Sequence, residues 1–377
     1  MSVERILAEL VRIDSRSSNS NRAVIDYARG RAEAAGLRTR LMSYADERGV
    51  EKFQLLAFAP DATDEVELAL VGHTDTVPFD AAWAEALTLV EHEGKLYGRG
   101  ACDTKGFIAA ALAAIEQVDL TKLARTLALV LTADEEVGCL GAKRLAEAKP
   151  FRARHAVVGE PTSLQPIRAG KGYCLAEVLV RGREAHSAYP HLGASAITRA
   201  ARLVERVERV AEALRLGAHA SFDPPHTTVN VGLIEGGTAK NVVAGECRFT
   251  LEWRPVPGQR PELVAELVRR EVEELRREDA DFDCELRVTR LDGGMETGRD
   301  APLVRALEEA TARASGTISF GTEAPQLAEL GAAAVVFGPG DIRVAHRTGE
   351  FVPVSELNEA VSILRGLIER FCAPGHQ

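Results

Sequence analysis

The chain has 377 residues, which is long enough for two domains, and its 46% hydrophobic and 27% charged residues are typical of a globular protein. A formal net charge of -10, without any lysine- or arginine-rich run, argues against a nucleic-acid partner, and no apolar run is long enough to span a membrane. Six cysteines without a C-x-x-C pair favour free thiols in the cytoplasm over a disulfide framework.

The first part of the chain has the pattern of an α/β protein. We predict helices over residues 3–14 and 21–36, strands over 37–42 and 53–58, and a buried helix over 107–115. Four strongly apolar runs are typical of fully buried strands. These runs cover residues 68–71, 126–132, 153–158 and 332–337. Buried strands with helices between them predict an α/β sheet that is covered on both faces.

The pattern changes between about residues 171 and 291. The expected order is strand, helix, strand, strand, helix, strand, over residues 174–180, 194–216, 227–234, 243–253, 261–278 and 282–291. This order is the split βαβ arrangement. Because the chain then returns to the first pattern, we expect residues 172–291 to form an insertion in a discontinuous domain of residues 1–171 and 292–377.

Five side chains that can bind metal lie at or near the ends of these predicted strands or in a Gly-x-Gly turn. They are His73, Asp103, Glu136, Glu160 and His346. Ligands usually bind at this edge of an open α/β sheet. Two imidazoles and three carboxylates suit zinc, cobalt or manganese. If one carboxylate bridges, the five ligands fit two metal ions about 3.5–4 Å apart.

Two further carboxylates lie beside these ligands in the sequence. Glu135 precedes a ligand and is a candidate general base that takes a proton from water. The alternative for Glu135 and Glu136 is an acidic first helical turn. Asp75 lies two residues after His73, and we expect its carboxylate to hold one ring nitrogen of that histidine.

Five motifs along the chain now point to a known family. They are His73-Thr74-Asp75, Gly100-x-x-Asp103-x-Lys105-Gly106, Glu135-Glu136, Gly159-Glu160-Pro161 and the late His346. Together they resemble the acetylornithine deacetylase and succinyl-diaminopimelate desuccinylase family of di-zinc amidohydrolases, over nearly the whole chain. The resemblance implies a zinc-exopeptidase-like catalytic domain of α/β class with an inserted ferredoxin-like lid, and a homodimer formed through that lid.

The same resemblance implies a role for each ligand. Asp103 would bridge the two metal ions, while His73 and Glu160 complete one site and Glu136 and His346 complete the other. The expected ions are zinc, with cobalt as the alternative. Glu135 would be the base, and the peptide bond after Asp103 is expected to be cis.

Three residues of the insertion resemble groups that act on the substrate. His186 resembles a histidine that crosses a dimer to polarise the scissile carbonyl, although a solvated loop histidine is the alternative. Asn241 and Arg254 resemble groups that hold the substrate carboxylate. Their alternatives are an ordinary turn asparagine and an exposed surface arginine.

The segment Gly321-Thr322-Glu323-Ala324-Pro325 favours the acetylornithine deacetylase branch of the family. We therefore expect hydrolysis of N-acetyl-L-ornithine in arginine biosynthesis, with Glu323 facing the substrate ammonium or, as the alternative, capping a helix. An N-acetylcitrulline deacetylase, another N-acyl-amino-acid amidohydrolase or dipeptidase, and a metal-free scaffold are the competing hypotheses. A serine hydrolase and an NAD enzyme are disfavoured, because the chain has no Gly-x-Ser-x-Gly elbow and its dinucleotide fingerprint is broken.

Overall fold

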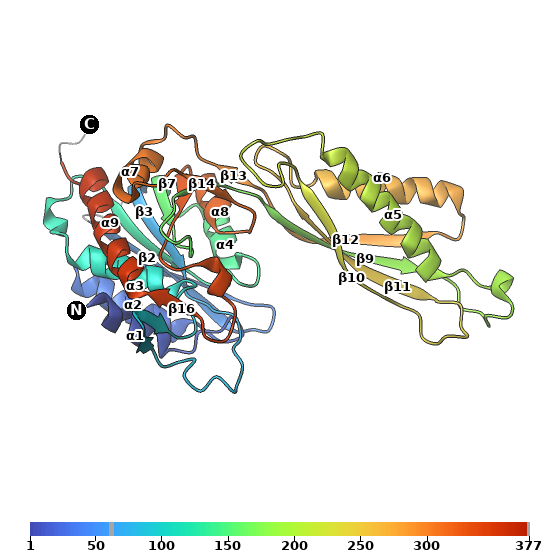
Figure 1. The fold of residues 1–377 in the computed structure, drawn as a ribbon, viewed down its shortest axis with the longest axis horizontal. Helices are drawn as coiled ribbons and strands as arrows, with labels where there is room; N and C mark the ends of the chain where they lie inside the picture. Colours follow the sequence, from blue (N-terminus) through green and yellow to red (C-terminus); the bar gives the residue numbers. More distant parts are fainter. Residues whose placement is uncertain (60–63, 375–377) are drawn as a thin grey trace. The chain divides into compact units, whose positions relative to one another are not determined.

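The computed structural model describes residues 1–59 and 64–374, and the chain divides into two compact units. Unit 1 comprises Met1–Arg168, Thr297–Gly316 and Thr322–Gln377, and unit 2 comprises Ala169–Glu296 and Thr317–Gly321. Figure 1 shows a sheet covered by helices in unit 1 and a second sheet with two long helices in unit 2.

A mixed sheet forms the centre of unit 1, with strand order β1-β2-β6-β3-β7-β15-β8. Its strands are β1 (Arg38–Ala45), β2 (Glu51–Ala59), β3 (Glu65–His73), β6 (Leu127–Thr132), β7 (Arg152–Val158), β15 (Ala333–Val336) and β8 (Ile167–Gly170). Strands β6, β3, β7 and β15 pair in parallel, whereas β1 and β2 are antiparallel additions at one edge. The four predicted buried strands therefore adjoin one another, and their carboxyl ends share one edge of the sheet.

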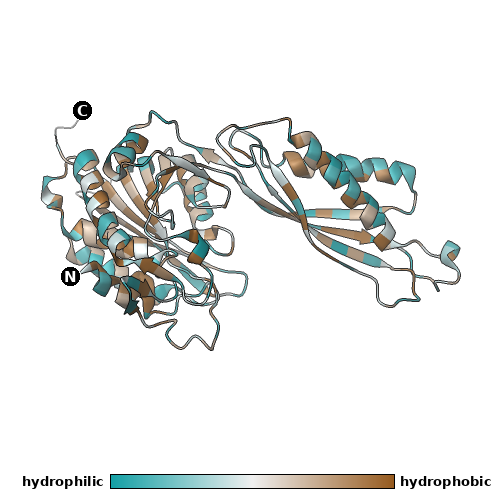
Figure 2. Ribbon diagram, in the orientation of Figure 1, coloured by the Kyte–Doolittle hydropathy of each residue, from teal (hydrophilic) through white to brown (hydrophobic). Residues whose placement is uncertain are grey.

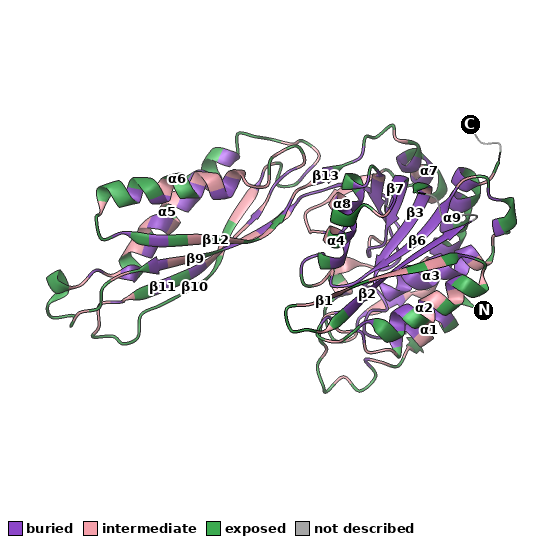
Figure 3. Cartoon of the chain, turned by 180° about the vertical axis from the view of Figure 1, so that it is seen from behind, coloured by how far each residue is buried: buried purple, intermediate pink, exposed green. Residues whose placement is uncertain are grey.

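Helices cover both faces of this sheet. They are α1 (Val3–Val11), α2 (Arg22–Ala34), α3 (Lys105–Glu116), α4 (Leu140–Ala148), α7 (Pro302–Thr311), α8 (Ala324–Glu329) and α9 (Val354–Cys372). In β3, Leu68 and Leu70 join the hydrophobic cluster beneath α1, α2, α3, α7 and α9. Ala69 and Val71 point to the opposite face and are equally buried. This double burial explains why residues 68–71 of β3 and 127–131 of β6 are apolar without a break, and Figures 2 and 3 show the hydrophobic and buried strands of this sheet.

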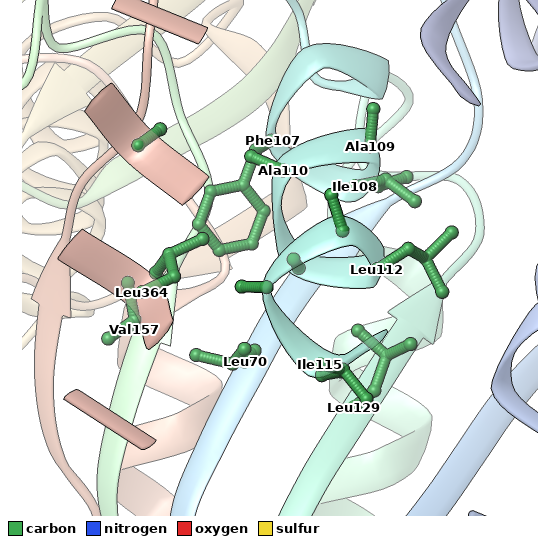
Figure 4. Close-up of a cluster of buried hydrophobic side chains, with 14 of the residues drawn as sticks. Leu70, Phe107, Ile108, Ala109, Ala110, Leu112, Ile115, Leu129, Val157 and Leu364 are labelled. Carbon is green, nitrogen blue, oxygen red and sulfur yellow. The ribbon is translucent and has the colours of Figure 1, made fainter. Parts of the chain in front are cut away.

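Helix α3 packs in the middle of the cluster and is buried on all sides, from Lys105 to Ile115. Figure 4 shows Phe107 directed toward Val157 of β7 and Leu364 of α9. The segment immediately before the helix carries Asp103, so this packing fixes where that carboxylate lies relative to the strand ends.

Unit 2 has the predicted split βαβ order and an antiparallel sheet with strand order β10-β11-β9-β12. Its elements are β9 (Tyr173–Arg181), α5 (Ala196–Leu214), β10 (Thr228–Gly236), β11 (Glu246–Arg254), α6 (Leu263–Glu278) and β12 (Asp283–Asp292). Cys247, Phe249, Leu251 and Trp253 are buried on the face that carries α5 and α6. The residues between them in β11 face the open side, so the alternation predicted from the sequence is confirmed.

Short strands complete the fold. Strands β13 (Met295–Glu296) and β14 (Gly316–Ile318) pair with β8, and β4 (Val90–His92), β5 (Lys95–Tyr97) and β16 (Phe351–Pro353) form a small sheet. Helices α4, α7 and α9 were not predicted from the sequence. Within residues 1–59 and 64–374, no helix combines the length and the apolar character that a membrane crossing requires.

Candidate metal centre

The parallel strands deliver the predicted ligands to one edge of the sheet of unit 1. His73 is the last residue of β3, Glu136 follows β6, and Glu160 comes two residues after β7. Asp103 precedes α3 and His346 lies in the loop between β15 and β16. The Asp103–Thr104 peptide bond is cis, as the family resemblance implied.

The five residues form two overlapping groups of potential metal ligands. His73, Asp103 and Glu160 make one group, and Asp103, Glu136 and His346 make the other. Within each group the ligand atoms lie within 4.8 Å of one another. Asp103 alone belongs to both, which is the arrangement that a bridging carboxylate requires.

The ligand atoms face one another directly. His73 Nε2 lies 3.0 Å from Asp103 Oδ1, and His346 Nε2 lies 3.1 Å from Asp103 Oδ2 and 3.0 Å from Glu136 Oε2. His73, Asp103 and Glu160 are buried, whereas the His346 side chain is 49% exposed. The second group is therefore the one that solvent can reach.

The electrostatics of this cluster suit a cation. Burial lowers the pKa of His73, but the nearby carboxylates of Asp103 and Asp75 outweigh it and raise that pKa well above its ordinary value. Hydrogen bonds to Asp103 and Glu136 raise the pKa of His346 to about 10. Burial opposes ionisation of Asp103, yet its bonds to both histidines keep its pKa low. The surrounding carboxylates thus cause both imidazole rings to hold their protons tightly, and a divalent cation can replace those protons.

The contact between Asp75 and His73 differs in detail from the prediction. His73 Nδ1 lies 3.0 Å from the backbone carbonyl oxygen of Asp75 but 3.6 Å from its carboxylate. The carboxylate instead accepts the backbone N–H groups of Glu135 at 3.1 Å and Glu136 at 3.3 Å, and the Ser17 hydroxyl at 2.7 Å. Asp75 therefore fixes the histidine through its main chain and the two glutamates through its side chain.

A buried ion pair that the sequence did not reveal supports the same turn. Lys52 Nζ lies 2.9 Å from Asp134 Oδ1, and both side chains are almost inaccessible to solvent. Asp134 also accepts the Tyr44 hydroxyl at 2.9 Å and has a positive φ of 59° directly before Glu135. No spacing rule marks Lys52, because a lysine at a strand start is usually exposed.

Glu135 lies beside the second group without belonging to it. Its Oε1 accepts the Cys139 thiol at 3.3 Å. Burial raises the pKa of Glu135, and the neighbouring Glu136 adds to this effect while His73 opposes it. A carboxyl group with a raised pKa beside potential metal ligands is suited to accept and return a proton near neutral pH.

Glu323 is fully buried in unit 1, immediately before α8. Its side chain makes no capping bond to that helix, and Oε1 has no hydrogen-bond partner among the residues that the structure describes. Burial raises the pKa of Glu323 to about 7, although the nearby His73 and the Thr132 hydroxyl lower it. The capping alternative for this residue is therefore not supported.

The three predicted residues of the insertion lie in unit 2 at two different places. His186 and Asn241 are exposed neighbours, since Ser187 N donates to the Asn241 carbonyl at 3.0 Å and His186 bridges to Val242. They lie at the end of the sheet where Glu246 of β11 pairs with Arg181 of β9.

Arg254 lies at the opposite end of β11, roughly 25 Å away for a strand that rises about 3.3 Å per residue. Its guanidinium stacks on Tyr173 at 4.5 Å, and it donates to Glu252 at 2.8 Å and to the Ser319 carbonyl at 2.9 Å. One chain therefore does not bring Asn241 and Arg254 together on one carboxylate. Arg254 is half-buried and held by these three contacts, so it is not an exposed surface arginine.

Curated relatives cover almost the whole chain. It is 55% identical over 368 residues to an acetylornithine deacetylase from Myxococcus xanthus, an alignment that covers 97% of this chain and 96% of the relative. It is 34% identical to an acetylornithine deacetylase from Proteus mirabilis (strain HI4320), with 95% of this chain and 92% of the relative covered.

Solved structures share the fold at lower identity. A tripeptidase from Staphylococcus aureus superposes with a TM-score of 0.78 at 23% identity, covering 97% of each chain. The Bacillus subtilis YxeP protein, a dinuclear metal-binding peptidase, has a TM-score of 0.68 at 13% identity, covering 98% of this chain and 99% of its own. The family model described as peptidase family M20/M25/M40 matches residues 69–370. The chain belongs to the M20/M25/M40 family of peptidases, and its mixed α/β fold with an inserted split βαβ unit is the fold of that family.

Proposed function

We propose that this protein hydrolyses N-acetyl-L-ornithine to L-ornithine and acetate with the help of two divalent metal ions. The observation that carries the proposal is the pair of ligand groups sharing Asp103, in a chain 55% identical over nearly its full length to an acetylornithine deacetylase. The ligands are imidazole nitrogens and carboxylate oxygens, a set that suits zinc, with cobalt as the alternative.

The chain supplies the ligands for both ions. His73 and Glu160 would hold one ion, Glu136 and His346 the other, and Asp103 both. Bound metal ions supply Lewis acidity toward the amide carbonyl and lower the pKa of bound water.

Glu135 moves the proton in this proposal. Its carboxylate accepts a proton from the attacking water and returns it to the nitrogen of the leaving amine as the C–N bond breaks. Ornithine then departs with a neutral amino group and the acyl product as acetic acid, which releases the second water proton to solvent and becomes acetate. Asp75 prepares this step, because it accepts the backbone N–H groups of Glu135 and Glu136 and so fixes the direction of both side chains.

A second copy of the chain completes the site in this proposal. His186 and Asn241 are exposed at one end of unit 2, and the edge strand β10 beside them exposes Leu233 and Ile234. An unpaired edge with apolar side chains is a natural place for a twin to pair. We assign His186 and Asn241 to the partner's active site and Arg254, by its planar fork, to the substrate carboxylate.

Glu323 accounts for the choice of ornithine. A buried carboxyl oxygen without a partner among the described residues is costly, and a substrate ammonium would satisfy it. Citrulline is neutral at this end, so its N–H groups can offer only hydrogen bonds without the charge of an ammonium. We therefore assign the protein to arginine biosynthesis and, since all six cysteines of the described chain are buried free thiols, to the cytoplasm.

Initial rates on a panel of N-acetyl amino acids, with the Glu323→Gln variant beside the parent, test this function. The parent should prefer N-acetylornithine, and the variant should lose roughly ten- to a hundred-fold in kcat/KM on that substrate but little on N-acetylcitrulline. A parent that prefers N-acetylcitrulline or a dipeptide would contradict the substrate assignment. Equal losses on both substrates, at unchanged metal content, would show that Glu323 does not select the substrate side chain.

A further inference from the structure

A second buried carboxylate accepts two consecutive backbone N–H groups, as Asp75 does for the two glutamates. Glu350 Oε1 accepts the backbone N–H of Cys102 at 2.9 Å and that of Asp103 at 3.0 Å. Its side chain is buried. Charged acceptors form shorter and stronger hydrogen bonds than neutral ones, so these two bonds fix the main chain at Asp103 firmly.

Arg99 fixes Glu350 in turn. Its Nη1 donates to Glu350 Oε2 at 2.6 Å, its guanidinium lies over the Trp83 ring, and its Nη2 donates to the Pro78 carbonyl at 3.3 Å. The Glu350 carbonyl also accepts the Gly98 N–H at 3.0 Å. The glutamate is therefore held by its side chain and its main chain against the turn that carries Asp103.

The position of Glu350 in the chain gives this contact a functional meaning. Glu350 lies four residues after His346, so it joins the loop that carries one ligand to the turn that carries another. Asp103 belongs to both ligand groups, and a small displacement of its carboxylate would disturb both. Mutation of a group that hydrogen-bonds to a metal ligand and so orients it typically lowers metal affinity by about 10–100-fold.

We propose that Glu350, fixed by Arg99, is a positioning residue that sets the place of the shared ligand Asp103 and thereby the affinity of the chain for metal. The proposal rests on the proposed two-metal function. It assigns a role that neither the ligand motifs nor the family resemblance indicated, since Glu350 contacts no substrate and belongs to neither ligand group.

Two variants separate positioning from stability. In Glu350→Gln the amide is a weaker acceptor, and its NH2 group faces the Arg99 donors. In the double variant Arg99→Met with Glu350→Leu both members of this ion pair are removed together, and the N–H groups of Cys102 and Asp103 lose their acceptor. Both variants should bind zinc at least tenfold more weakly than the parent, measured on metal-depleted protein by competition with a chromogenic chelator.

The matched control is Glu116→Gln. It breaks the ion pair with Arg31, whose Nε donates to Glu116 at 2.8 Å in the same unit but away from the ligands. This control should lower the thermal midpoint without changing zinc affinity.

Each outcome of the titration decides one point. Parental zinc affinity in Glu350→Gln would overturn the proposal, because the changed acceptor would then have no effect on metal binding. Parental zinc affinity in the double variant would also overturn it, because a loss in Glu350→Gln would then come from the unpaired arginine. Because the titration needs no substrate, it stands apart from the substrate assignment. A parent that itself binds no zinc would contradict the proposed function instead.

Discussion

At the scale of single residues, the neighbouring carboxylates Glu135 and Glu136 have different surroundings. Glu136 lies within reach of His346 and Asp103, whereas Glu135 accepts the Cys139 thiol and belongs to neither ligand group. Both follow Asp134 directly, which has a positive φ. Asp75 then fixes both backbone N–H groups, so adjacent side chains can point differently without being free to move.

The variant Glu135→Gln tests this division. The amide side chain that it introduces cannot carry a proton, so turnover should fall by about 10²–10⁴ while two metal ions and substrate binding are retained. Glu136→Gln should instead lose a metal ion. Steady-state rates together with metal analysis by mass spectrometry measure both effects, and a Glu135→Gln rate within a few-fold of the parent would remove this residue from the chemistry.

The buried carboxyl of Glu323 predicts a dependence of stability on pH. Its pKa rises from 4.5 to about 7 on folding, so in this window the folded chain keeps a proton that the unfolded chain has released. The free energy of unfolding contributed by this group is therefore highest at low pH and falls as the pH rises through the window, by at most about 3 kcal/mol. Denaturant titrations of metal-free parent and Glu323→Gln should show a difference that changes with pH in this direction. Parallel curves would contradict it.

At the scale of elements, the sequence predicted the parts of the fold in which burial is total. Strand β6 and the second half of β3 are apolar without a break because both of their faces are covered, and the predicted ligands lie at or just after the ends of β3, β6 and β7. Helix α9 was missed although it contributes Leu364 and Leu367 to the core. No periodicity indicated Lys52 or Glu350, because their roles depend on backbone groups that are distant in the sequence.

The packing of α3 against the end of β7 gives an element-scale prediction. A Cβ added at Gly159 would lie 2.1 Å from a ring carbon of Phe107, so Gly159→Ala forces the strand end away from the helix. We expect a loss of about 1–3 kcal/mol in stability and weaker zinc binding, since Glu160 is the next residue. Gly30→Ala in α2 is the control, because nothing lies within 4 Å of the added Cβ. Gly159→Ala protein with parental stability would show that this close approach does not constrain the ligand.

At the scale of the whole molecule, the proposed active site needs two chains. Asn241 and His186 lie far from Arg254 within unit 2, and the exposed edge of β10 offers a surface for a twin. We expect a homodimer in which each copy contributes its His186 to the active site of the other.

Mixed dimers test this exchange. Inactive His186→Ala chains and inactive Glu135→Gln chains, after subunit exchange, should recover up to about a quarter of the parental activity, because one site of each hybrid then has both groups. The control mixes each variant with itself. Absence of rescue despite proven exchange would place His186 in the active site of its own chain or outside the chemistry.

We expect this chain to release ornithine from N-acetylornithine only when its two ligand groups hold metal. The most direct measurement follows ornithine release while metal-depleted protein is titrated with zinc, with bound metal counted by mass spectrometry in the same samples. Turnover should be negligible without metal and reach full activity as occupancy approaches two ions per chain. Undiminished release of ornithine by metal-free protein, or no release at full occupancy, would contradict it.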